Sequence, residues 1–181
     1  MSVRDSQRSR VYNAESPLFY GEGARPYLLG STRDALEFAR RIVDFCAGEQ
    51  WPLRLQPHWA APRLEFTERM SASGRYTAMK DGRDRIRIRA GMLNKVLLIH
   101  EYAHWAHRWL YPAIGLWRCV PSHGPQWASL YLILAYHLIG PGCYSSLVRR
   151  FDECGVGVHA EFLWMCGLTV SSALQEAEAA A

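Results

Sequence analysis

Residues 91–109 are predicted to form an α-helix that is apolar on nearly every side. Apolar residues fill most of the stretch KVLLIHEYAHWAHRW within it, which leaves no continuous polar face for solvent. A helix of this kind is buried in the protein rather than lying on its surface. Polar side chains in a buried helix are costly unless a partner satisfies them. His100, Glu101 and His104 therefore need such a partner.

These three residues belong to an HExxH pattern, residues 100–104. Positions four apart share one face of an α-helix, so both imidazoles can reach one ion, and Glu101 lies about a quarter-turn away. A zinc ion lowers the pKa of its water toward about 7 and polarises a carbonyl oxygen. Glu101 can then accept the proton and pass it to the leaving amine. The competing interpretation is a pair of core histidines bonded to backbone carbonyls.

Three candidates exist for a third metal ligand. We favour His123, nineteen residues after His104 and directly before Gly124-Pro125, where a new helix is expected to begin. His107 lies on nearly the same face as His104 but about 4.5 Å farther along the axis, so we expect it beside the site, in a cleft wall, or in a structural role. Glu161 is the fallback ligand. Zinc is the expected metal from the geometry, although other divalent ions also bind nitrogen ligands.

The segments HEYAHWAH and SHGPQWASLYLIL, at 100–107 and 122–134, resemble the zinc-peptidase (zincin) pattern of the SprT-like group. In that group HExxH is followed by a histidine in an HGPxF/W context. The resemblance implies a zincin-like fold that binds Zn²⁺. It also implies four site residues: His100, His104 and His123 as ligands, and Glu101 as the general base.

The similarity extends to the flanking segments VYNAE at 11–15 and GPGCYSSLVRRFDECGV at 140–156. Over this span the chain is most similar to an uncharacterised metallohydrolase family of actinobacteria and their phages, whose substrate is unassigned. The SprT-type proteases that process DNA–protein crosslinks often carry a C-terminal cysteine zinc ribbon. The five cysteines of this chain lie far apart and form no CxxC pair, so the resemblance does not carry the DNA-repair role with it.

Patterns on both sides of the HExxH helix predict an α+β fold. Apolar residues recur at helical spacing over 31–47, where Ser31 or Thr32 can cap the helix. Two further helices are predicted, over 125–139 with Pro125 in the first turn and over 142–154.

The segment from 51 to 90 alternates between apolar and polar residues. The alternation includes Leu53 and Leu55, Leu64 and Phe66, and the run RIRIR at 85–89, with glycines at 74 and 82 expected in turns. This pattern predicts a small, mostly antiparallel sheet of three or four strands, with one face buried and one solvated.

We expect the sheet to pack on the HExxH helix in one zincin-like domain over 31–156. The preceding residues 1–30 are predicted to be an irregular lead-in, because Gly21, Gly23, Pro26 and Gly30 punctuate them. Residues 157–181 are predicted to be a C-terminal extension with an Ala/Glu-rich tail.

Two secondary candidates have a functional and a structural interpretation. Tyr131 lies eight residues after His123, and its phenol can donate to a developing oxyanion; we favour a core tyrosine bonded to backbone. Arg85, Arg87 and Arg89 share one strand face and can bind phosphate or acidic substrate segments. We favour a solvated sheet face for this stripe.

The leading hypothesis is a zinc-dependent hydrolase, a metallopeptidase acting on a protein or peptide. The alternative is a non-catalytic, zinc-stabilised module that binds a protein or nucleic acid. A net charge of +4 permits nucleic-acid contact without requiring it. The first residues are polar, which predicts no secretory signal. The longest apolar run, 130–139, is too short to span a membrane, so we expect a cytoplasmic protein. The oligomeric state is not predicted.

Overall fold

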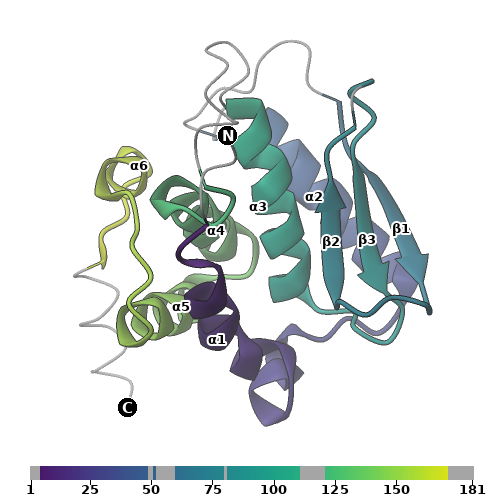
Figure 1. The fold of residues 1–181 in the computed structure, drawn as a ribbon, viewed down its shortest axis with the longest axis horizontal. Helices are drawn as coiled ribbons and strands as arrows, with labels where there is room; N and C mark the ends of the chain where they lie inside the picture. The colour runs from purple at the N-terminus through teal and green to yellow at the C-terminus, as the bar shows by residue number, and fades with distance from the viewer. Residues whose placement is uncertain (1–4, 49–50, 52–59, 80, 111–120, 171–181) are drawn as a thin grey trace.

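The computed structural model describes residues 5–48, 51, 60–79, 81–110 and 121–170 (Figure 1). A small three-stranded sheet combines with several helices, so the predicted α+β class is confirmed. In chain order the elements are α1 (Arg8–Phe19), the 3-10 helix η1 (Glu22–Tyr27), α2 (Thr32–Ala47), β1 (Arg63–Thr67), β2 (Gly74–Thr77), β3 (Arg85–Arg89), α3 (Lys95–Leu110), α4 (Pro125–Leu138), α5 (Pro141–Glu153) and α6 (Ala160–Met165).

The sheet has the order β1-β3-β2 and is mixed, which corrects the mostly antiparallel prediction. β2 and β3 form an antiparallel pair around a turn at Gly82, whose φ is +75°. β1 pairs with the other edge of β3 and runs parallel to it. Alternation in a sequence tells which side chains face inward, but it does not tell which strands become neighbours or in which direction they run. The predicted strand at Leu53 and Leu55 lies outside the described residues.

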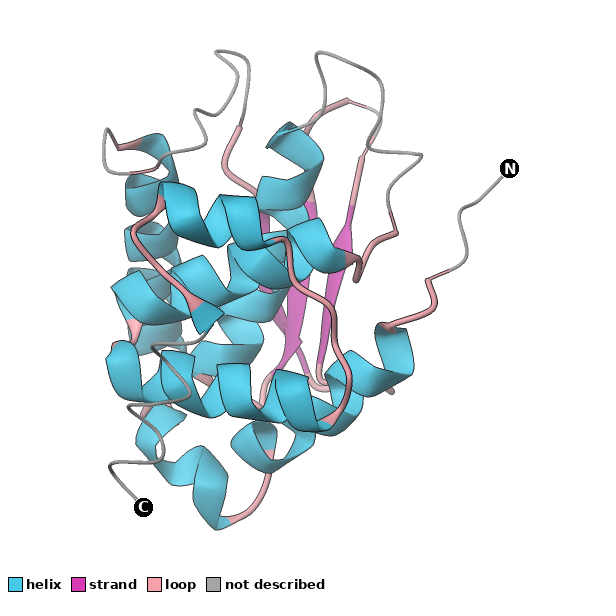
Figure 2. Cartoon of the chain, turned by 90° about the vertical axis from the view of Figure 1, so that its left-hand side faces the viewer, coloured by secondary structure: helices cyan, strands magenta, loops and turns pink. Residues whose placement is uncertain are grey.

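One face of the sheet is buried against helices and the other is exposed. Ile86 and Ile88 are fully buried, while Arg85, Arg87 and Arg89 point to solvent, as the alternation predicts. α2 packs near β1, and α3 packs against β2 and β3. Figure 2 shows most of the helices in front of the strands. The strand order makes β1 and β2 the two edges of the sheet.

The HExxH helix α3 lies at the centre of the molecule, as its apolar sequence predicts. It packs on α4, and most of its side chains between Val96 and Ala106 are buried. Asn94 caps its start, because its Oδ1 accepts hydrogen bonds from the amides of Val96 (2.8 Å) and Leu97 (3.4 Å). The Asn94 amide also donates to the carbonyl of Leu18 in α1 at 2.9 Å. One side chain therefore fixes both the start of α3 and its contact with α1.

A buried carboxylate fastens the other end of α3 to the sheet. Asp84 is fully buried and pairs with Arg108 in the last turns of α3. It also accepts hydrogen bonds from the Tyr76 hydroxyl at 2.7 Å and the Met79 amide at 3.0 Å. Because the charge is paired and hydrogen-bonded, its burial is tolerated and holds β2 beside α3.

The N-terminal segment differs from its prediction. Residues 1–30 were expected to be irregular, but α1 and η1 occupy most of the described part. Val11, Ala14 and Leu18 have helical spacing and are 0–5% exposed. Glu15 interrupts this stripe, although it is itself fully buried, and so it hides the helical pattern. Of the four residues expected to punctuate this region, Gly21 and Gly30 lie outside the helices, whereas Gly23 and Pro26 lie within η1.

The C-terminal part contains one helix that the sequence reading did not predict. α4 and α5 agree closely with the predicted helices, and Pro125 and Pro141 each lie in a first turn. Within the predicted extension 157–181, α6 packs on α4, while the residues from 171 onward lie outside the described part. Among the described helices, none has the length and apolar character to cross a membrane.

Candidate metal centre

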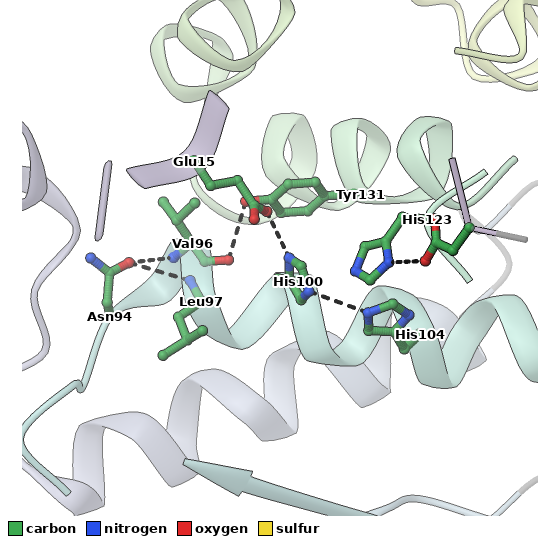
Figure 3. A network of polar contacts seen from close by, with 9 residues as sticks. Glu15, Asn94, Val96, Leu97, His100, His104, His123 and Tyr131 are labelled. Carbon is green, nitrogen blue, oxygen red and sulfur yellow. Dashed lines mark hydrogen bonds and ion pairs between the residues drawn. The ribbon is translucent and has the colours of Figure 1, made fainter. Parts of the chain in front are cut away.

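Three histidines from two separate segments meet beside α3. His100 and His104 extend from α3, and His123 comes from the turn directly before α4 (Figure 3). One nitrogen from each ring lies within 4.8 Å of those of the other two. The Nε2 atoms of His100 and His104 are 3.2 Å apart, and the ring centroids of His104 and His123 are 4.6 Å apart. This is the set of candidate ligands that the sequence analysis favoured.

Two carboxylates orient the outer nitrogens of these rings. Nδ1 of His100 lies 2.7 Å from Oε1 of Glu15, and Nδ1 of His123 lies 2.6 Å from Oδ2 of Asp5. A hydrogen bond at Nδ1 leaves the Nε2 lone pair free for a metal ion, because the carboxylate fixes which nitrogen carries the proton. Figure 3 shows Glu15 and His123 on opposite sides of His100. Both rings are thus held with Nε2 toward the cluster.

Two of the three rings, His104 and His123, are in the neutral form that binds a cation. Burial lowers the pKa of His104 well below its usual range and that of His123 to about 4, so both rings are neutral. Burial opposes the charge on His100 as well, but the adjacent Glu15 carboxylate outweighs it and raises the pKa. The Nε2 of His123 is buried without a hydrogen-bond partner among the described residues. A buried, unpaired nitrogen lone pair beside two further imidazoles fits a divalent metal ion with nitrogen preference, such as zinc.

Glu101 is positioned against the edge strand. It is 4% exposed, and a Cβ at Gly74 would come within 2.6 Å of its Oε1, so the carboxyl group lies directly against the Gly74 backbone. Burial raises the pKa of Glu101 to about 7, and a backbone hydrogen bond from Tyr76 partly opposes that rise. A carboxyl group with a pKa near neutrality can both accept and release a proton.

The cluster opens into a cleft above α3, which consists of two adjoining cavities. The cavity beside the histidines has a volume of about 280 Å³, and its neighbour has a volume of about 410 Å³. α1 forms one wall and the start of the edge strand β2 forms the other. The residues shared by the two cavities are Arg8, Tyr12, Ala72, Gly74, His100 and Glu101.

Aromatic rings support the histidines from behind. The Trp127 ring lies 4.8 Å from the His100 ring, 5.0 Å from the His104 ring and 4.8 Å from the His123 ring. Trp127 is fully buried. His104 also stacks on Tyr76 of β2 at 6.3 Å. Apolar packing of this kind restricts the rings and keeps the site at low polarity.

Tyr131 does not reach the cleft. It is fully buried behind His100, lines neither cavity, and its hydroxyl donates to the Val96 carbonyl at 3.4 Å. From this position the structure favours the core interpretation over the oxyanion role. Tyr12 of α1 occupies the cleft side instead, stacked on His100 at 5.9 Å.

The other two ligand candidates do not belong to the cluster. His107 is 5% exposed, lines neither cavity, and burial lowers its pKa to about 4. Its position is that of a structural residue of α3. Glu161 is exposed in the short helix α6 and is not part of the cluster.

No family model, curated protein or solved structure matches this chain. The functional argument therefore depends on the site itself. The sequence analysis did not assign to the site the residues that α1 and the segment before it contribute: Asp5, Arg8, Tyr12 and Glu15. The resemblance of VYNAE at 11–15, which contains Tyr12 and Glu15, was an available signal that this segment belongs to the site.

Proposed function

We propose that this protein is a zinc-dependent metallopeptidase with a zincin-like arrangement. The observation that carries the proposal is the meeting of His100, His104 and His123 with the Glu101 carboxyl group lining the same cavity. Catalytic zinc sites use three protein ligands and keep one position for water or substrate, whereas structural sites are closed by four. A cleft that opens onto a set of three histidines corresponds to the catalytic type.

The residues divide the chemistry between them. Zinc held by the three imidazoles would supply an acidified water molecule and polarise the scissile carbonyl. Glu101 would take a proton from the attacking water and deliver it to the leaving nitrogen, which yields a carboxylic acid and an amine. Since Glu101 is fixed against Gly74, its carboxyl group requires little reorganisation to do so.

The edge strand supports a peptide as the substrate. β2 is an edge of the sheet, and Gly74 and Tyr76 in it line the cavity beside the histidines. An extended peptide can add to such an edge through main-chain hydrogen bonds. This would place its carbonyl groups above α3, near Glu101. The resemblance of the HExxH and HGPQW segments to the SprT-like group supports the same proposal.

Metal analysis of two variants tests the proposal. The wild-type protein is expected to bind one zinc ion and to hydrolyse peptides. The H100A variant should lose both properties, and E101Q should keep the zinc and lose hydrolysis. A folded wild-type protein that stays metal-free in added zinc would contradict the proposal. Tightly bound zinc without hydrolysis in the wild-type protein would instead favour the zinc-stabilised binding module.

A further inference from the structure

We propose that the substrate is a peptide in which a carboxylate lies beside a large apolar side chain, and that Arg8 binds the carboxylate. This inference rests on the proposed peptidase function and names its substrate class. It comes from the charges and the apolar residues that line the cleft.

The charges in the cleft are unbalanced. Its lining contains two arginines, Arg8 from α1 and Arg75 from β2, and a single carboxyl group, Glu101. The Glu15 and Asp5 carboxylates behind His100 and His123 offset the charge of the proposed zinc ion, and Glu101 is committed to proton transfer, so the excess of positive charge comes from the two arginines. A concave site with this excess of positive charge attracts anionic groups.

Arg8 is placed to provide the specific contact. Its guanidinium group lies over the Tyr12 ring, 5.5 Å from the centroid, and Arg8 lines both cavities. Neither Arg8 nor Arg75 forms an ion pair with a carboxylate of the described residues, whereas Arg25, Arg63, Arg108 and Arg149 do. A guanidinium group binds a carboxylate through two parallel hydrogen bonds, which gives orientation as well as attraction.

The larger cavity supplies the second preference. Phe19, Tyr20 and Leu97 line it, and no charged residue lines it apart from Arg8, Glu101 and His100. At about 410 Å³ it has the size of a small-molecule pocket, with room for a large apolar side chain. Because Arg8 borders both cavities, the carboxylate and the apolar side chain would lie close together. The carboxylate can belong to an Asp or Glu side chain or to the C-terminus.

Cleavage of peptide libraries tests the inference. Zinc-loaded wild-type protein, R8Q and the control R40Q, an exposed arginine of α2 outside the cleft lining, are incubated with a proteome-derived peptide library. A second copy of the library has all its carboxylates methyl-esterified, and a third has only its C-termini amidated. Mass spectrometry identifies the new ends. In parallel, zinc-loaded E101Q and E101Q/R8Q are used to capture peptides from the native library.

The wild-type and R40Q proteins should cut beside an acidic group paired with a large apolar residue. Esterification of the library and the R8Q substitution should each reduce the number of these cuts at least about tenfold, as expected for loss of a charge-assisted contact. In the capture experiment, E101Q should retain acidic peptides that E101Q/R8Q does not. Loss of cutting in the amidated library assigns the carboxylate to the C-terminus, and retention assigns it to a side chain. Cuts that are indifferent to esterification and to R8Q would overturn this inference alone. A zinc-loaded protein that cuts no library would overturn the peptidase function as well.

Discussion

The helix α3 and the N-terminal segment both build the candidate metal centre, but they differ in how sequence encodes their parts. α3 places His100 and His104 on one face through the helical repeat alone. The N-terminal segment places Glu15 and Asp5 against His100 and His123, across sequence separations of 85 and 118 residues. The ligands on α3 follow from local geometry, whereas the residues that orient the ligands depend on tertiary packing.

The comparison has a physical consequence for the site. If the N-terminal segment only covers the cleft, changes in it should leave metal binding intact. If it orients the rings, as the short Nδ1–carboxylate distances indicate, its loss should weaken metal binding without unfolding α3. Four changes follow, beginning with the largest expected effect; E15Q separates these two cases, and the other three test the ligand set, the position of Glu101 and the role of Tyr131.

The H123A variant removes the third imidazole. We expect the zinc affinity to fall by more than about 100-fold, beyond the range seen when only an orienting partner is lost. Competition with a chelator of known affinity measures this. H137A, which removes an exposed histidine of α4, is the matched control and should bind zinc as the wild type does. Unchanged affinity in H123A would remove His123 from the ligand set.

The G74A variant tests the position of Glu101. The added methyl group would meet the carboxyl oxygen at 2.6 Å and displace it. We expect kcat to fall by about 100-fold, since small misplacements of a catalytic group have effects of this size, while zinc stays bound. G91A is the control, because a Cβ at Gly91 meets no atom within 4 Å. Full activity in G74A would show that Glu101 need not lie where the structure places it.

The E15Q variant tests the N-terminal segment directly. Glutamine keeps the shape of the side chain but removes the charge that orients His100, so the zinc affinity should fall by about 10- to 100-fold. The exposed E37Q in α2 is the control. Equal affinities in the wild type, E15Q and E37Q would show that α1 merely covers the site.

The Y131F variant should have the smallest effect. Its hydroxyl lies behind His100, beside Glu15 and 3.4 Å from the Val96 carbonyl, and does not reach the cleft, so kcat should stay within about twofold of the wild-type value. Removing a donor to an oxyanion would instead lower kcat by about 100- to 1000-fold. A loss of that size would restore Tyr131 as a catalytic residue.

The parts of the fold that local signals define could be predicted. Ser31 and Pro125 mark helix starts, and α2 and α4 begin there in the structure, while α5 begins at Pro141, one residue before the predicted start at 142. The direction of β1 could not be predicted, because strand pairing depends on the path of the whole chain. The sequence analysis missed α1 because one of its buried positions is Glu15. A charged residue at that position interrupts the apolar repeat by which a helix is recognised.

In the candidate site, too, the residues set by local signals could be predicted and those set by tertiary packing could not. His123 followed from its place before Gly124-Pro125, where a helix start fixes the backbone. Tyr131 was misplaced because its position was counted from His123 along a helical repeat. The helix begins only at Pro125, so that repeat does not govern the direction of the His123 side chain. The contacts of Asp5 and Glu15 have no spacing rule from which they could be derived.

Crystals of the zinc-loaded protein, measured at the zinc absorption edge, test the central claim most directly. The anomalous density should contain one strong peak about 2.0–2.1 Å from the Nε2 atoms of His100, His104 and His123, with the fourth position facing the cleft. Zinc bound elsewhere, or a fourth protein ligand that closes the shell, would contradict it.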